Sequence, residues 1–189
     1  MLIASYLRDG QPGKAMNVIE PVLDKIDKDS NMLALAGQVF MQNGQVDKAG
    51  TYFAKAAALD PKNTGKRTSL AMVNLAKGDS DVAFRDLEQV AAADTGNRAD
   101  LALIAAHLQR REFDQALKAI ASLEKKQPDN PLTHNLRGTA LLGKRDMAGA
   151  RKSFDKAVAL NPAYFPAAAN LANLDLAEKK PDEARKRFE

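Results

Sequence analysis

The sequence predicts an all-α fold in which short antiparallel helix pairs repeat along the chain. Three observations predict it: an alanine that recurs at a nearly constant interval, prolines at a fixed distance after it, and glycines between the two helical segments of each unit. A period of this length is typical of solenoids, in which each unit packs only on its neighbours.

The period is marked by an alanine that is followed four residues later by a large apolar residue. Successive alanines are 34, 34, 33, 34 and 34 residues apart. Residues four apart share one face of a helix, so each pair marks the buried face of a second helix. The six pairs are Ala15 with Ile19, Ala49 with Phe53, Ala83 with Leu87, Ala116 with Ile120, Ala150 with Phe154, and Ala184 with Phe188.

The ends of these second helices are marked by proline. Pro61, Pro128 and Pro162 lie twelve residues after the alanine of their unit, and Thr95 takes this place once. Because proline cannot continue a helix interior, we expect the second helices to end there.

A second apolar pattern before each alanine predicts the first helix of the unit, because its spacing places the residues on one face. It reads Leu33, Ala36, Gly37 and Phe40, then Leu101, Ile104, Ala105 and Leu108, and it begins again at Ala168, Leu171 and Ala172.

The turn between the two helices carries glycine in the first three units, at Gly10, Gly44 and Gly78. Glycine there permits the left-handed backbone that commonly closes a helix. Acidic residues suit the first turn of the helix that follows; these are Asp47, Asp81, Asp114 and Asp182. The fourth unit is one residue short at 110–112, so we expect its turn to differ.

A small residue in the first helix, then alanine, a large apolar residue and proline together resemble the tetratricopeptide repeat over the whole chain. The resemblance implies a right-handed superhelical solenoid of about five and a half repeats. Trp is absent from its favoured place. We also expect looser packing where Asn74, Leu141 and Asp175 stand in the aromatic slot of Phe40. The expected repeats span 1–29 (partial), 30–63, 64–97, 98–130, 131–164 and 165–189 (partial).

Both terminal repeats are incomplete in this sequence, and neither has a polar capping repeat. We therefore expect a fragment of a longer protein, with open ends that could stack on one another.

In tetratricopeptide arrays, the first helices line the concave face and partners lie along it. In this chain that face combines small, weakly apolar side chains with amides and no charge. It lacks the Lys, Asn and Arg set that grips a C-terminal carboxylate in some members of the family. We expect a protein or peptide of low charge to bind there, unless these positions merely face water. The candidate binding residues are Asn31, Gln38, Met41, Thr68, Met72, Leu75, Ala102, Ala106, Gln109, Asn135, Thr139, Leu142, Asn173 and Leu176.

Basic pairs end the first helices of the last three units, at 110–111, 144–145 and 179–180. One interpretation is that these residues complement the negative pole of a helix. The alternative is that they form a basic edge that recognises an acidic partner or a membrane surface. Residues 185–187 would extend such an edge.

The sequence offers no catalytic or cofactor site. It has no Cys, and its two histidines, His107 and His134, lie in different units without the spacing of a metal site. We expect no enzyme activity, no metal and no cofactor. A helical-repeat nucleic-acid binder is a less favoured alternative, because the net charge is only +4 and stacking aromatics are scarce. No apolar run is long enough to span a membrane.

Three further stretches, 97–104, 124–131 and 163–172, resemble the long tetratricopeptide lipoproteins of PEP-CTERM/exosortase systems in Gram-negative bacteria. That resemblance implies a periplasmic or envelope-associated scaffold in protein sorting or exopolysaccharide export. The alternatives are a cytoplasmic protein and a non-catalytic segment of a larger enzyme.

Overall fold

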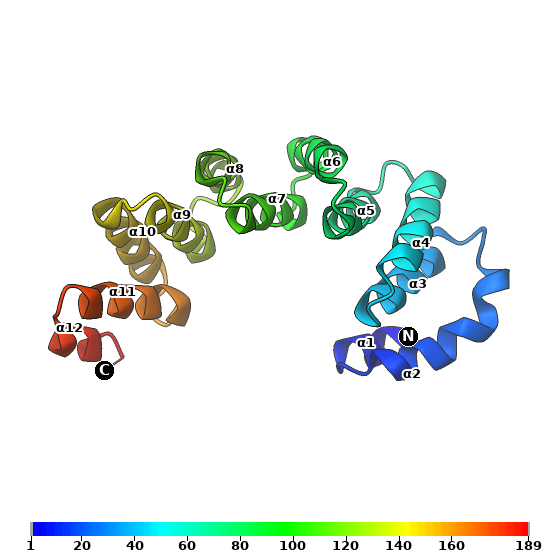
Figure 1. Ribbon diagram of the computed structural model, residues 1–189, viewed down its shortest axis with the longest axis horizontal. Coiled ribbons are helices and arrows are strands. Elements are labelled where there is room, and N and C mark those ends of the chain that lie inside the picture. Colours follow the sequence, from blue (N-terminus) through cyan, green and yellow to red (C-terminus); the bar gives the residue numbers. More distant parts are fainter. Residues whose placement is uncertain (1, 189) are drawn as a thin grey trace. The chain divides into compact units, whose positions relative to one another are not determined.

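A computed structural model describes residues 2–188, and within them it contains α-helices, one 3₁₀ helix and no strand (Figure 1). The predicted all-α fold of paired helices is therefore confirmed. The helices are α1 (Leu2–Arg8), α2 (Pro12–Ile19), η1 (Glu20–Lys25), α3 (Ser30–Gln42), α4 (Val46–Leu59), α5 (Thr64–Lys77), α6 (Ser80–Ala93), α7 (Arg98–Gln109), α8 (Phe113–Lys126), α9 (Pro131–Gly143), α10 (Met147–Leu160), α11 (Phe165–Ala177) and α12 (Pro181–Lys186).

The chain divides into two compact units, residues 1–102 and 103–189, which we call the N-terminal and C-terminal units. In the N-terminal unit, helices that follow one another in the chain pack together, from α1 on α2 to α5 on α6. The same holds from α8 on α9 to α11 on α12 in the C-terminal unit. Each helix thus buries its apolar face mainly against its sequence neighbours, as in a solenoid.

Three of the first helices, α3, α5 and α9, begin at side-chain caps. Asp29 accepts hydrogen bonds from the backbone N–H groups of Asn31 and Met32, and Asn63 accepts one from Lys66. Asn130 accepts another from Leu132. These bonds satisfy N–H groups that the first turn of a helix leaves without partners.

The turns within the repeats share one geometry. Gly10, Gly44 and Gly78 have φ values of 67°, 75° and 94°, in the left-handed region. The amide of Gly44 donates to the carbonyl of Met41 at 3.1 Å, and Gln45 donates to Phe40 at 2.9 Å. These hydrogen bonds close the helix before the chain reverses.

The turn of the shorter fourth repeat has this geometry too, so the prediction that it differs is wrong. Arg111 has φ of 61°, its amide donates to Leu108 at 3.0 Å, and Glu112 donates to His107 at 2.9 Å. The missing residue is instead taken from the first helix, because α7 has 12 residues where α3, α9 and α11 have 13.

This deletion changes which face of α7 is buried. Removing one residue rotates the rest of a helix by about 100°. We compare α7, counted back from the turn at Arg111, with α3, counted back from Gly44. The positions that hold Leu33, Ala36, Gly37 and Phe40 in α3 hold Asp100, Leu103, Ile104 and His107 in α7. All four of these α7 residues are buried. The predicted face was therefore right only at Ile104, since Leu101 and Leu108 are half-buried and Ala105 is exposed.

The first repeat departs from the others in its second helix. Here α2 ends at Ile19 and the chain continues as the 3₁₀ helix η1. Pro21 explains the change, because it has no N–H to donate to the preceding turn of an α-helix.

Two repeats are held together by a close contact between residues 16 positions apart, one on each helix. A Cβ added to Gly37 would lie 2.8 Å from Phe53, and one added to Gly138 would overlap the Phe154 ring. The rings of Phe53 and Phe154 are buried, as predicted. The equivalent positions of the third repeat hold Ala71 and Leu87, so the second-helix residue is smaller than Phe and the first-helix residue is larger than Gly. In the fourth repeat they hold Ile104 and Ile120, which are both large; all four residues are buried.

Phe188 does not join this pattern, contrary to the prediction. It is 56% exposed, and its ring lies 5.7 Å from that of Phe165. The reason is that α12 ends at Lys186, so Phe188 no longer follows the helical period.

Asp175 was expected to loosen the packing of the sixth repeat, and that expectation is wrong. Its side chain is only 3% exposed and accepts from Arg151 Nη1 at 2.6 Å and from Arg187 Nε at 3.0 Å. Burial alone would raise the pKa of Asp175, but the hydrogen bonds and charges of the two arginines outweigh it, so the pKa lies below its ordinary value. The carboxylate thereby ties α10 and the residue after α12 to α11.

We predict that Gly138→Ala destabilises the protein, because overpacking a core costs about 1–3 kcal/mol and outweighs a helix-propensity gain of up to ~1 kcal/mol. Adding Phe154→Leu should recover much of the loss, since Ala with Leu is the pairing at Ala71 and Leu87. Urea unfolding of the two single variants and the double variant measures this coupling. Strictly additive losses would contradict the volume argument.

We also predict that Asp175→Asn lowers stability near pH 7. A carboxyl with a depressed folded-state pKa stabilises above its unfolded pKa of about 3.9, and that contribution is lost as the pH falls through the folded-state value. The gap between wild type and variant in urea unfolding should therefore close below about pH 4. Asp155→Asn is the matched control, because Asp155 lies 3.7 Å from Arg187 but is exposed. A gap that stays constant with pH would contradict the prediction.

Candidate binding face of the first helices

The N-terminal unit presents most of its predicted binding residues at or near the surface. Asn31 and Gln38 on α3 and Met72 on α5 are exposed, and Met41 and Leu75 are half-buried, as is Ala102 on α7. Thr68 is the exception, and its expected exposure is wrong. It is 1% exposed and its hydroxyl donates to the carbonyl of Thr64 at 2.8 Å, because a Thr inside a helix can bond back along its own turn.

The C-terminal unit shows a similar mixture. Gln109, Thr139, Asn173 and Leu176 are exposed, and Asn135 and Leu142 are half-buried. Ala106 is only 8% exposed, because the rotated register of α7 turns it inward. Asn135 already accepts a hydrogen bond from Asn170 Nδ2 at 3.0 Å, which links α9 to α11.

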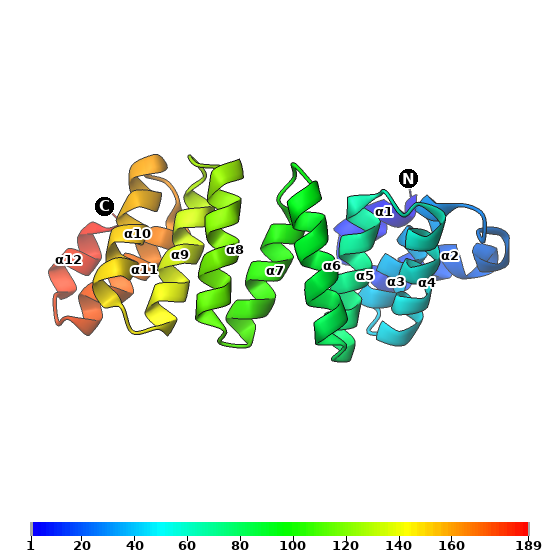
Figure 2. The same cartoon turned by 90° about the horizontal axis from the view of Figure 1, so that it is seen from above.

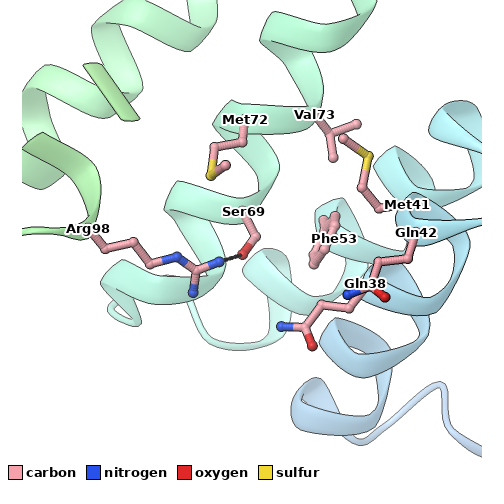
Figure 3. Close-up of a pocket in the computed structure, with 8 residues that line it drawn as sticks. All are labelled: Gln38, Met41, Gln42, Phe53, Ser69, Met72, Val73 and Arg98. Carbon is pink, nitrogen blue, oxygen red and sulfur yellow. Dashed lines mark hydrogen bonds between the residues drawn. The ribbon is translucent and has the colours of Figure 1, made fainter. Parts of the chain in front are cut away.

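A cavity of about 350 Å³ in the N-terminal unit brings three predicted residues together. Figure 3 shows Gln38 and Met41 of α3 near Met72 of α5, with the Phe53 ring of α4 between the helices. Sequence reasoning found these three because they lie on the first helices. It missed the other lining residues, which are Gln42, Phe53, Ser69, Val73 and Arg98.

The inner wall of this cavity is apolar and fixed. Phe53 is 3% exposed and Val73 is 1% exposed, so both belong to the core of the unit. Met72 is 42% exposed and, with Met41, provides a flexible thioether wall. Such a wall adapts to aliphatic side chains of different shapes.

The rim of the cavity is polar. Arg98 Nη2 donates to Ser69 Oγ at 2.9 Å (Figure 3). Ser69 Oγ in turn donates to the carbonyl of Gly65 at 3.0 Å. The description of this face as uncharged is therefore wrong at Arg98. No repeat pattern could have found it, because the equivalent first residues of α3, α5, α9 and α11 are Ser30, Thr64, Pro131 and Phe165.

The two histidines have structural contacts. His107 Nδ1 lies 2.8 Å from Glu112 Oε2, and Arg110 Nε donates to the other oxygen of Glu112 at 2.7 Å. The hydrogen bond with His107, followed by that with Arg110, holds the pKa of Glu112 below its usual range. His134 Nε2 lies 3.3 Å from the carbonyl of Pro128. Within residues 2–188, no three His, Asp or Glu side chains are grouped so that they could hold a metal ion.

Within the described residues 2–188, no helix is long and apolar enough to span a bilayer. The arrangement found on the first helices suits non-covalent recognition. An aliphatic side chain fits the apolar wall, while Gln38 and Gln42 can donate to and accept from a peptide backbone.

Comparison with known proteins agrees with this fold. Two family models, both described as Tetratricopeptide repeat, match residues 30–63 and, in two overlapping stretches, 68–131 and 101–165. A curated relative, the BBSome complex member BBS4 of Bos taurus, is 28% identical over 146 residues. That match covers 75% of this chain but only 28% of the relative.

Solved structures of low sequence identity share the fold. The Cut9 and Hcn1 hetero-tetramer of APC/C matches with a TM-score of 0.73 and 21% identity, over 98% of this chain and 37% of that one. MamA of Desulfovibrio magneticus RS-1 matches with a TM-score of 0.66 and 17% identity, over 84% and 90%. A thermophilic tetratricopeptide protein of Thermus thermophilus, TTC0263, gives 0.63 and 21%, over 84% and 88%.

Proposed function

Because the chain belongs to the tetratricopeptide repeat family, whose fold suggests a protein-interaction scaffold, we propose that its first helices bind a polypeptide partner. The observation that carries this proposal is the cavity on α3 and α5, which Gln38, Met41 and Met72 line around the Phe53 ring. An apolar wall with a few polar groups at its rim is the usual form of a pocket that recognises a side chain.

The apolar lining of the cavity suits an aliphatic side chain of the partner. Its wall of Met41, Met72 and Val73 offers dispersion contacts, and the amides of Gln38 and Gln42 lie where a peptide backbone would pass. The partner segment is therefore extended or helical, low in charge, and anchored by one side chain.

The names of two similar proteins agree with an assembly role. BBS4 is named as a member of the BBSome complex, and Cut9 is described within a hetero-tetramer. This chain spans well under half of each, so any activity or partner of a whole protein is part of the proposal. Tetratricopeptide proteins are generally non-catalytic scaffolds, and a non-catalytic segment of a larger enzyme is the second candidate.

A more specific role, in envelope protein sorting or exopolysaccharide export, rests on the resemblance of residues 97–104, 124–131 and 163–172 to envelope lipoproteins. The proteins named above give it no support. We keep a place in envelope protein sorting or exopolysaccharide export as a proposal, together with the cytoplasmic alternative.

Met72→Glu should weaken binding about tenfold or more, because it places a carboxylate in the apolar cavity. Val82→Glu is the matched control, since Val82 is 47% exposed on the second helix α6, against 42% for Met72. Peptides selected on the wild-type protein from a display library would be measured against both variants by fluorescence anisotropy. Equal affinities for the wild type and Met72→Glu would refute the cavity as the binding site.

In the C-terminal unit, Asn135→Arg combined with Asn173→Arg should abolish binding by any peptide that contacts α9 and α11. The added guanidinium groups fill the first-helix face, and a partner of low charge would have to bury them without a counter-charge. Asn135→Ser alone removes the hydrogen bond to Asn170 without adding charge, so it separates packing from binding. If the double arginine variant has unchanged affinity and an unchanged circular dichroism melt, the first-helix face of this unit is not the binding site.

A further inference from the structure

Three turn residues of the C-terminal unit have a left-handed backbone although they carry a side chain. Arg111, Arg145 and Lys179 have φ values of 61°, 63° and 60°. They occupy the turn positions at which the N-terminal unit has Gly10, Gly44 and Gly78. All three are basic.

Glycine would suit these positions better, because a Cβ makes the left-handed region unfavourable. The turn itself does not require a side chain, since the N-terminal unit forms the same hydrogen bonds with glycine. Strain that a simple substitution would remove points to a function of the strained residue.

These three residues are also the ones left without partners in their basic pairs. Arg110 pairs with Glu112, Lys144 with Asp114, and Lys180 with Glu178. Arg111, Arg145 and Lys179 are exposed, and within residues 2–188 none of them forms an ion pair or a side-chain hydrogen bond.

Two residues of the cluster at 185–187, which was expected to extend this set, already have acidic partners. Arg187 donates to Asp175, and Lys186 pairs with Glu183 at 3.0 Å.

The three cations lie along one side of the C-terminal unit. Figure 2 shows the turns from α7 to α8, α9 to α10 and α11 to α12 at the same edge of this unit, along the bottom of the view. The unit as a whole is basic, with 16 Lys and Arg against 11 Asp and Glu in residues 103–189, whereas residues 1–102 have 12 against 13.

We propose that Arg111, Arg145 and Lys179, which we call the turn edge, bind an acidic segment of a partner protein. This surface is separate from the first-helix cavity and does not depend on it. Helices of successive repeats pack about 8–10 Å apart, and an extended chain advances about 3.3 Å per residue. Successive cations are separated by a whole helix pair, so an extended segment that carries carboxylates at regular intervals can meet more than one of them.

The acidic side chains at the same edge favour a protein segment over nucleic acid. Glu112, Asp114 and Glu178 lie beside the three cations and would repel a continuous line of phosphates or a charged lipid surface. A peptide can place its carboxylates on the cations and its uncharged residues between them.

The test is the triple variant Arg111→Gly, Arg145→Gly and Lys179→Gly in the full chain. Glycine relieves the left-handed strain, so the melting temperature should rise by a few degrees or stay unchanged. The probe is a labelled peptide with Glu at every third position, and its affinity should fall about tenfold in the variant. A peptide with Gln in place of Glu should bind neither protein, and added salt should weaken the Glu peptide's binding.

The matched control is Lys125→Gln with Lys152→Gln and Lys156→Gln, which removes the same charge from exposed positions on α8 and α10. Equal loss of affinity in both triple variants would show attraction by net charge and overturn the turn edge. Unchanged affinity in the glycine variant would overturn it as well. Tighter binding of single-stranded DNA or phosphatidylserine vesicles than of the Glu peptide, lost in the glycine variant, would refute a protein partner.

Discussion

The contact between residues 16 positions apart is the constraint on which the rest of the structure depends. It joins the two helices of one repeat, and it is tightest where a glycine faces a phenylalanine ring. Gly37 gives room to Phe53, and Gly138 gives room to Phe154. Because interiors are close-packed, the separation of the two helices depends on the pair and not on either residue alone. The first-helix face, and with it the cavity at Met72, is positioned by this contact.

Much of the fold could be predicted from the sequence, because many independent signals agree on one period. Alanine marks the buried face of each second helix, and the proline, glycine and acidic positions mark helix ends in register with it. The described helices agree with this period. The location of the deletion in the fourth repeat could not be predicted, since the alanine interval records only the total length. The hydrogen-bonded turn at Arg111 kept its geometry, so α7 absorbed the change by rotating.

Side-chain partners were the least predictable feature. Asp175 stands in an apolar slot of the repeat, and nothing nearby in sequence shows that Arg151 and Arg187 neutralise it. Arg98 reaches the cavity from the first residue of α7, a position with a different kind of side chain in the other repeats. Helical periodicity predicted the exposed residues of the candidate binding face. Its charge and its buried member Thr68 depend on contacts that periodicity does not encode.

The left-handed turn position has a consequence for how such an array can change over generations. It touches neither the 16-residue contact nor the packing between repeats, so its side chain varies without disturbing the core. A glycine codon becomes an arginine codon by a single base substitution. Each repeat can therefore gain or lose a surface charge independently, at the small cost of one strained residue.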